Sequence, residues 1–178
     1  MTEYMDGEPI EFSVKKAALL EAKILLPVLA FVIPLVFSGP QWITGTIVNA
    51  LLFIASEKLT GKQLYPVLVL PSLGAVAHGV LFGPQTVFLY YFLPFIWFGN
   101  YLLAVVFSQT KGKNYLIRIS LSALAKYLLL QTMAQIYFQN AIVPKIFVSS
   151  MGYIQLLTAF FGGIVSYITL HYFSKIHE

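Results

Sequence analysis

Six long apolar stretches, separated by short polar turns, dominate this sequence. They cover residues 14–37, 41–55, 64–82, 86–107, 115–137 and 148–172. Most of them approach the length of roughly 20 residues that a helix needs to cross the hydrocarbon core of a bilayer. The connections are rich in turn-forming residues and short enough to join neighbouring antiparallel helices. The pattern predicts an all-α integral membrane bundle of six transmembrane helices, formed as one domain by residues 14–178.

The composition agrees with this expectation. Hydrophobic residues make up 58% of the chain and charged residues only 10%, against about 25% charged residues in an ordinary soluble domain. A chain this apolar has too few polar side chains to cover a surface in water, so most of its apolar side chains must face lipid. Residues 1–13 hold four of the seven acidic residues and are expected to form an acidic cytoplasmic tail.

The positions of Lys and Arg predict the orientation of the bundle, because cytoplasmic loops are enriched in these residues. Six crossings that start in the cytoplasm place nine of the eleven cations on the cytoplasmic side: Lys15, Lys16, Lys23, Lys58, Lys62, Lys111, Lys113, Arg118 and Lys175. Lys145 falls on the outer side and Lys126 inside the fifth span. We therefore expect a multi-pass protein of the cell membrane with both termini in the cytoplasm. The excess of cations is explained by this topology and does not indicate binding of nucleic acid.

No Asp or Glu occurs between Glu57 and Glu178. Ion-coupled transporters usually hold their ion with intramembrane carboxylates or with the carbonyls of broken helices. Intramembrane hydrolases use paired carboxylates, a metal or an activated nucleophile. The chain also lacks cysteine and the HExxH, GxSxG, Walker A and GxGxxG motifs. These absences predict a protein that is not an enzyme, holds no metal or cofactor, and takes any energy for transport from a partner.

Lys126 is the most unusual residue in the apolar stretches. It lies about 11 residues from each end of the fifth span, roughly 16 Å of helix rise, which is further than a lysine side chain extends comfortably. Insertion of a lysine at the centre of a bilayer costs about 2.5–3.5 kcal/mol. Two explanations stay open: the ammonium contacts an anionic or carbonyl-bearing ligand, or backbone carbonyls, Tyr127 or a bilayer defect satisfy it. The helical face that Lys126 occupies is expected to point inward. It also holds Arg118, Ser122, Leu129, Met133, Tyr137 and Asn140.

Polar and aromatic residues gather mostly in the outer half of the predicted bundle. An unsatisfied amide is costly in hydrocarbon, so such groups are expected to face the interior. An outward-open pocket of amides and aromatic rings is the form expected for capture of a small organic molecule. The residues predicted to bind the substrate are Trp42, Thr46, Asn49, His78, Asn100, Lys126, Gln131 and Gln135. The alternative for each is an interhelical hydrogen bond or a place in an aromatic belt.

Chain length, six spans, cytoplasmic termini and an outer-half pocket together resemble the substrate-binding S components of energy-coupling factor (ECF) vitamin transporters. Residues 18–22 (ALLEA) also match the AxxxA pattern that this family often carries in its first helix. The resemblance implies a subunit that captures a vitamin or another micronutrient and has no motor of its own. It implies contact through Ala18 and Ala22 with a transmembrane T component, which works with two ATPases. It further implies that loading closes an outer gate and that the subunit topples in the membrane to release its ligand.

Two alternatives belong to other functional classes. A structural or assembly subunit of a larger membrane complex would use the polar residues as ties between helices, and Lys126 would pair with an acid of a partner. An intramembrane enzyme would use His78 and Lys126, but spans three to six hold no Asp or Glu to work with them. Stabilisation by one small molecule would distinguish a capture subunit from a structural one.

Overall fold

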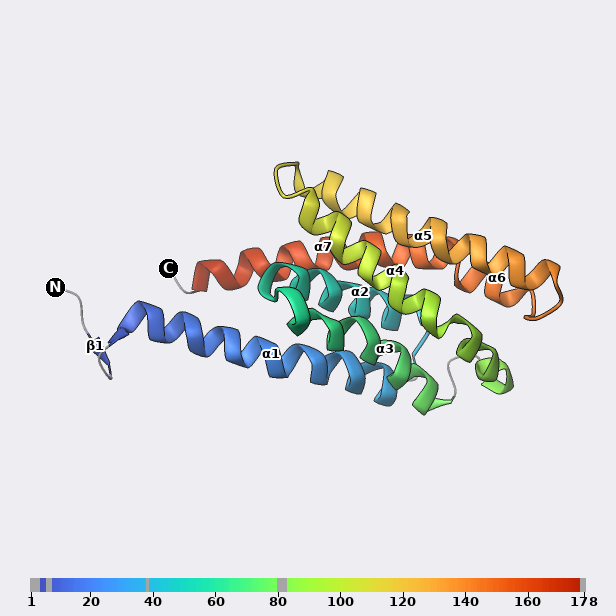
Figure 1. Cartoon of the computed structure of the whole chain (residues 1–178), viewed down its shortest axis with the longest axis horizontal. Coiled ribbons are helices and arrows are strands. Elements are labelled where there is room, and N and C mark those ends of the chain that lie inside the picture. The colour runs from blue at the N-terminus through green and yellow to red at the C-terminus, as the bar shows by residue number, and fades with distance from the viewer. Residues whose placement is uncertain (1–3, 6–7, 38, 80–82, 177–178) are drawn as a thin grey trace.

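The computed structural model of the chain is a bundle of helices (Figure 1). It describes residues 4–5, 8–37, 39–79 and 83–176, with the side chains of residues 19–37, 39–79 and 86–172. The α-helices are α1 (Ile10–Val36), α2 (Gln41–Lys58), α3 (Tyr65–His78), α4 (Leu89–Gln109), α5 (Tyr115–Gln139), α6 (Ile146–Ser150) and α7 (Tyr153–Ile176). The 3₁₀ turns η1 (Gly61–Leu64) and η2 (Gly83–Phe88) precede α3 and α4. Before α1, the two-residue strands β1 (Tyr4–Met5) and β2 (Glu8–Pro9) pair antiparallel.

Particular residues account for two of the helix ends. Asn114 caps the start of α5, because its side-chain oxygen accepts a hydrogen bond of 2.9 Å from the backbone N–H of Leu116. α3 ends at Gly79, whose φ of 70° lies in the left-handed region that favours glycine. A different glycine of α3, Gly74, lets this helix approach α1 closely, since a Cβ there would collide with the carbonyl oxygen of Phe31.

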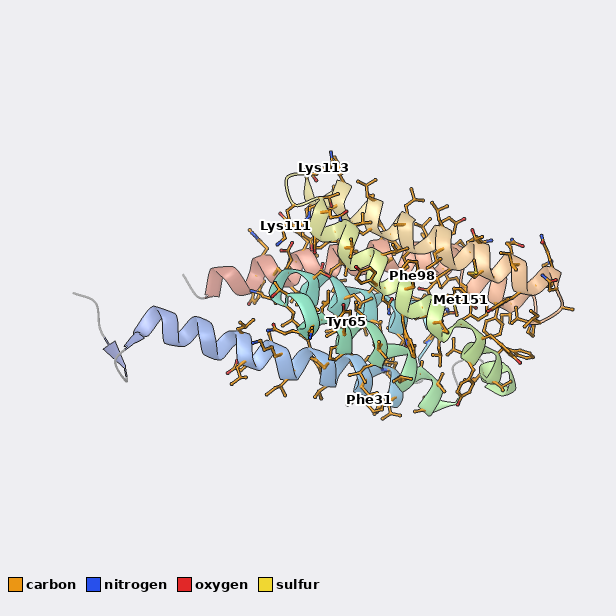
Figure 2. All side chains as sticks on the ribbon, in the orientation of Figure 1. Phe31, Tyr65, Phe98, Lys111, Lys113 and Met151 are labelled. Atoms are coloured by element: carbon orange, nitrogen blue, oxygen red, sulfur yellow. The ribbon has the colours of Figure 1, made fainter. Side chains whose placement is uncertain are left out.

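The start of α1 and the end of α7 lie at the same end of the bundle, together with the α2–α3 and α4–α5 connections (Figure 1). We call this the terminal end and the other the opposite end. Lys111 and Lys113 project from the α4–α5 connection at the terminal end (Figure 2). Lys145, directly before α6, is exposed at the opposite end. The uneven distribution of cations along the sequence is therefore also an uneven distribution between the two ends of the bundle.

Four segments of the described chain are long and apolar enough to cross a membrane: Leu19–Val36, Thr86–Gln109, Tyr115–Gln139 and Ile146–Tyr172. Large apolar side chains cover their outer surfaces, and Ile24, Leu128 and Ile168 are each more than half exposed. Apolar surfaces of this extent suit contact with lipid rather than with water. The chain is thus a helical, multi-pass membrane protein.

Helices α2 and α3 do not meet the same criteria of length and composition. α3 has 14 residues, which is about 21 Å of helix, and α2 has 18 residues and ends on Glu57 and Lys58. α2 packs against α1, α3, α4 and α7, and eight of its residues are buried. Short or polar segments are tolerated at membrane depth where other parts of the protein cover them. By length and composition, four of the six expected crossings are therefore supported.

A polar layer divides the apolar core along the bundle. On α5, Ala123 belongs to one buried apolar cluster and Leu130 to a second one. Lys126 lies between these two residues and is itself buried. On α4, the buried Asn100 occupies the corresponding place between the two clusters. Two polar side chains from neighbouring helices thus interrupt the core at the same level.

The inward face of α5 follows the expected stripe over its first part only. Arg118, Ser122 and Lys126 are buried, as expected. After Lys126 the buried positions continue in steps of four, at Leu130 and Ala134, whereas the expected positions further along are half-buried or exposed. Steps of four exceed the 3.6 residues of a helical turn, so the buried line rotates slowly around α5.

Candidate binding site

A cavity of about 90 Å³, here called the Lys126 cavity, lies at the polar layer. Its apolar wall includes Val48, Leu89 and Ile96. Its polar lining consists of Gln41, Thr44, Asn49, Ser72, Asn100, Lys126 and Gln155. Lys126 is the one ionisable side chain among the lining residues, so the lining carries a single cationic group.

The cavity extends from the middle of the bundle toward the opposite end. Several lining residues stand where their helices begin or end on that side, among them Gln41 at the start of α2 and Leu89 at the start of α4. The Gln41 side chain donates a hydrogen bond of 3.1 Å from Nε2 to the carbonyl oxygen of Ser150 at the end of α6. This bond ties α2 to α6 beside the cavity.

Lys126 points at Asn49 across the interior of the bundle. Its Nζ donates a hydrogen bond of 2.7 Å to Oδ1 of Asn49, and only 3% of the lysine is exposed. The Asn49 amide nitrogen in turn donates to the carbonyl oxygen of Gly45, at 2.8 Å, and to the Thr158 hydroxyl, at 3.2 Å. Among the described residues, the acceptor for this ammonium is therefore the neutral amide of Asn49, which hydrogen bonds to α2 and α7 hold in place.

Two glycines bring α2 and α7 close enough to hold Asn49 in this position. A Cβ at Gly162 of α7 would lie 2.7 Å from Cβ of Asn49 and 2.8 Å from the backbone nitrogen of Ala50. A Cβ at Gly45 of α2 would lie 3.1 Å from Cγ2 of Thr158. A side chain at either position would push the two backbones apart. The Asn49–Thr158 hydrogen bond depends on this close approach.

Two further polar atoms in the cavity lining have no hydrogen-bond partner among the described residues: Oγ1 of Thr44 and Oδ1 of Asn100. Both residues are buried. The Asn100 amide nitrogen donates a hydrogen bond of 2.7 Å to the carbonyl oxygen of Leu68, which can only accept, so the orientation of this amide is settled and Oδ1 is left as an acceptor. Unsatisfied buried polar groups are uncommon in folded proteins and call for an explanation.

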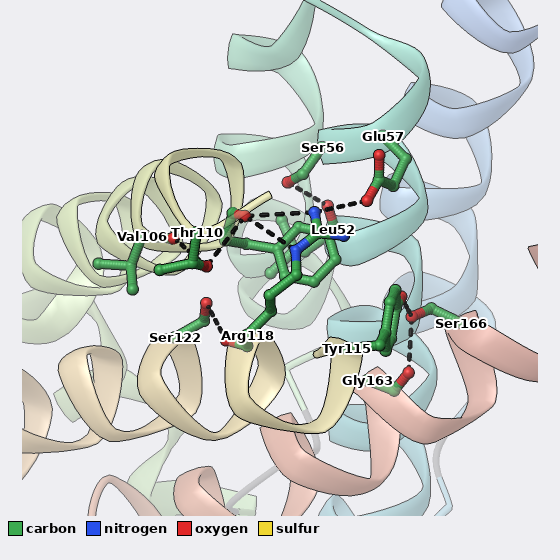
Figure 3. A network of polar contacts seen from close by, with 11 residues as sticks. Leu52, Ser56, Glu57, Val106, Thr110, Tyr115, Arg118, Ser122, Gly163 and Ser166 are labelled. Atoms are coloured by element: carbon green, nitrogen blue, oxygen red, sulfur yellow. Dashed lines mark hydrogen bonds and ion pairs between the residues drawn. The ribbon is translucent and has the colours of Figure 1, made fainter. Parts of the chain in front are cut away.

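A second buried cation, Arg118, lies on α5 two helical turns closer to the terminal end. Figure 3 shows its side chain directed at Glu57. Its Nη2 is 2.6 Å from Oε1 of Glu57, and its Nε and Nη2 donate to the carbonyl oxygen of Phe107 at 3.3 and 3.2 Å. The guanidinium carbon also lies 3.8 Å from the centre of the Phe107 ring. Since Glu57 pairs with Arg118, this carboxylate does not serve Lys126.

Of the predicted substrate-binding residues, the structure brings Asn49, Asn100 and Lys126 together in one cavity. Trp42 and Thr46 lie outside its lining. Trp42 is 63% exposed, and the hydroxyl of Thr46 donates to the carbonyl oxygen of Trp42 on its own helix, at 2.7 Å. These two residues belong to a face of α2 that points away from the cavity.

The other three predicted residues are also absent from the cavity lining. His78 sits at the end of α3, where its Nδ1 is 2.6 Å from the carbonyl oxygen of Leu35 near the end of α1; there it satisfies one of the carbonyls that a helix end leaves unpaired. The Gln131 side chain lies against Gly152 in the α6–α7 link, and Gln135 is half-buried further along α5.

The predicted contact pair Ala18 and Ala22 lies on α1. Ala22 is half-buried against the apolar core and borders a groove of about 480 Å³ with Ile54 and Glu57 of α2. Ala18 is part of α1, but its side chain lies outside the described residues.

Four polar lining residues were missed from the sequence: Gln41, Thr44, Ser72 and Gln155. Gln41, Thr44 and Val48 follow the helical spacing i, i+3, i+7 along one face of α2. By helical spacing Asn49 also shares a stripe with Trp42 and Thr46, which lie outside the lining. Gln41 and Thr44 are the signal that could have identified the correct face.

Metal ligands do not come together in the described part of the chain, where no three His, Asp or Glu side chains are close enough to hold an ion. The groups that the Lys126 cavity offers are an ammonium, a hydroxyl and amide oxygens. These groups form hydrogen bonds to a ligand and neutralise negative charge.

Comparisons with protein-family models, with curated proteins and with solved structures find no match to this chain. Its function is therefore inferred from the cavity, from the distribution of charge and from the membrane-spanning helices.

Proposed function

We propose that this protein is a membrane-embedded, non-catalytic subunit that captures a small organic molecule in the Lys126 cavity for uptake. One observation carries the proposal: a buried ammonium shares a cavity with two buried polar atoms, on Thr44 and Asn100, that lack partners among the described residues. A bound molecule would supply those partners. Buried apolar pockets with a few convergent polar groups are the usual form of small-molecule sites.

The orientation belongs to the proposal. Six crossings with both termini in the cytoplasm put Lys111 and Lys113, at the terminal end, on the cytoplasmic side of the cell membrane. The Lys126 cavity then lies in the outer half of the bundle, with Gln41 and Leu89 near its entrance. A molecule arriving from outside would meet the cavity first.

The energy for uptake is proposed to come from a separate membrane partner with ATPase subunits, as in the ECF transporters that this chain resembles. Among the lining residues of the cavity there is no carboxylate to couple a proton or sodium ion to transport. The α1–α2 groove beside Ala22 is the proposed contact for the partner. Replacing Ala22 with Leu should reduce co-purification of a T component, whereas Val28→Leu, on an exposed position of α1, should not. Equal co-purification of both variants would remove Ala22 from the interface.

The experiment that tests capture is native mass spectrometry of the protein purified in mild detergent, with identification of any molecule released on denaturation. A stoichiometric organic molecule, absent from a control membrane protein purified in the same way, is the expected result. Repeated absence of such a molecule would contradict the proposal.

The second candidate is a structural subunit of a larger membrane complex. The Lys126–Asn49–Thr158 hydrogen bonds favour it, because they tie α5, α2 and α7 together without a ligand. Thermal unfolding separates the two functions. A capture subunit gains about 2.7 kcal/mol when its ligand is present at a hundredfold excess over Kd, whereas a structural subunit responds to a protein partner only.

A further inference from the structure

The charge of the Lys126 cavity is unbalanced. Lys126 is its one ionisable lining residue. The two acidic side chains that the structure describes are elsewhere: Glu57 pairs with Arg118, and Glu21 is exposed on α1. Within the described residues, the ammonium therefore meets a neutral amide oxygen and no carboxylate.

An ammonium has three N–H donors, and Asn49 uses one of them. A carboxylate is a stronger partner than an amide oxygen, because its full negative charge attracts the ammonium in addition to accepting the hydrogen bond. Low dielectric surroundings strengthen the attraction further. The part of the cavity around Lys126 thus favours a ligand with one negative group over a neutral ligand of the same shape.

Asn100 defines a second requirement on the ligand. Its nitrogen is held by the Leu68 carbonyl, and its Oδ1 is buried without a partner among the described residues. An N–H or O–H group of a ligand would satisfy this oxygen. The hydroxyl of Thr44 can donate or accept, so it suits either end of such a ligand.

The volume of the cavity sets the size of the ligand. One water molecule requires about 10–15 Å³ of cavity volume measured in this way. The cavity of about 90 Å³ therefore has room for about six to nine water-sized groups. Sites for drug-sized molecules are larger, about 300–1,000 Å³. Val48, Leu89 and Ile96 provide an apolar wall for the body of the ligand.

We infer that the Lys126 cavity selects a compact organic monoanion, with its carboxylate on Lys126 and an N–H or O–H group on Asn100. This inference rests on the proposed capture function and specifies its substrate class. It disfavours cations, which Lys126 repels, and dianions, whose second charge would face neutral groups only. The body of the ligand is apolar and small.

The test compares acids with their uncharged amides on the full-length protein in mild detergent. The probes are butyrate and butyramide, isovalerate and isovaleramide, and benzoate and benzamide, which span the inferred size range. Binding is measured by thermal shift and by isothermal titration calorimetry. Each pair is measured on the native protein, on Lys126→Met, and on Lys145→Met as a matched control at an exposed lysine. A further probe, 3-hydroxybutyrate, adds a donor to butyrate.

We expect at least one acid to bind about tenfold more tightly than its amide, a difference of about 1.4 kcal/mol. Lys126→Met should abolish that preference and Lys145→Met should retain it. The added hydroxyl of 3-hydroxybutyrate should increase affinity on the native protein, and this gain should disappear in Asn100→Leu. If Lys126→Met does not fold, the acid and amide pairs on the native protein still decide the question.

Three results would overturn the inference: amides that bind as well as their acids in all three pairs, a preference for acids that survives in Lys126→Met, or no stabilisation by any probe. Native mass spectrometry of the same preparation then distinguishes failure of the monoanion inference from failure of the proposed capture function. A bound molecule that is neutral or larger would support the capture function and contradict the inference of a compact monoanion. If no molecule is bound and no probe binds, both the capture function and the monoanion inference are contradicted.

Discussion

Arg118 and Lys126 are two buried cations on the same face of α5, about 12 Å apart along the helix, and their surroundings differ completely. Arg118 has a carboxylate, a backbone carbonyl and an aromatic ring. Lys126 has one neutral amide oxygen and a cavity. A buried charge that the chain neutralises holds the fold together, whereas one that it leaves unneutralised is available to a partner from outside.

The chemistry of the two side chains fits this division. The planar guanidinium presents several donors in a fixed geometry, so it can bind Glu57 and the Phe107 carbonyl at once while it stacks on the Phe107 ring. The lysine ammonium is a compact charge on a flexible stem. Asn49 uses one of its three N–H donors, which leaves two for a ligand.

The largest effect on stability is expected from Arg118→Met. It leaves the Glu57 carboxylate without its partner, and breaking a buried ion pair on one side costs about 3–5 kcal/mol. Glu57 is 24% exposed, so water recovers part of the loss and we expect about 3 kcal/mol. The free energy of unfolding in mixed detergent micelles measures it. Lys113→Met, an exposed control at the same end, should change stability by about 0.5 kcal/mol at most. A loss as small as that of the control would show that Arg118 is no more structural than a surface residue.

An intermediate effect is expected from Asn49→Leu. The substitution removes the acceptor that the described residues offer to the Lys126 ammonium, and the loss of a hydrogen bond to a charged group costs about 2 kcal/mol. Most of this loss should disappear when Lys126→Met is also present, because no unpaired charge then remains. Unfolding of the two single variants and the double variant measures the coupling. Thr158→Val is the matched control, since it removes a partner of Asn49 and leaves the ammonium its acceptor. Equal losses with and without Lys126 would contradict the assigned role of Asn49.

The smallest effect on stability is expected from Lys126→Met. Replacing a buried charge that lacks a charged partner with an apolar side chain of similar length is often neutral or stabilising, so the free energy of unfolding should change by about 1 kcal/mol at most. The same micelle titration measures it beside Arg118→Met. If Lys126→Met destabilises the protein as much as Arg118→Met does, both cations are structural and the distinction between them is wrong.

Much of the fold was predictable from the sequence because hydropathy acts locally. Membrane-crossing helices follow from runs of apolar residues, and four of the predicted runs meet the criteria of length and composition. Two details were not predictable from those runs. The last span is broken by a turn at Met151 and Gly152 between α6 and α7, and α3 ends early at Gly79. The first break leaves backbone that other parts of the protein must cover, and the second uses the left-handed conformation of Gly79.

The candidate site was predictable in part. Asn49, Asn100 and Lys126 were selected because polar groups in hydrocarbon must face the interior, and all three line one cavity. His78 was selected by the same rule but bonds the end of α1 instead, and Trp42, selected as an aromatic ring, is exposed. The rule predicts that a polar group faces the interior of the bundle. It does not predict which neighbour the group will contact there.

The sequence by itself determined that this chain is a helical membrane protein with cations concentrated toward one end of its bundle, because lipid and charge act on each segment separately. The tertiary structure decided which cation was neutralised. Glu57 and Arg118 are 61 residues apart, and Asn49 and Lys126 are 77 residues apart. Only the packing of α2 and α5 against the same two helices, α4 and α7, with the close approach at Gly162, places the carboxylate beside the arginine and the amide beside the lysine.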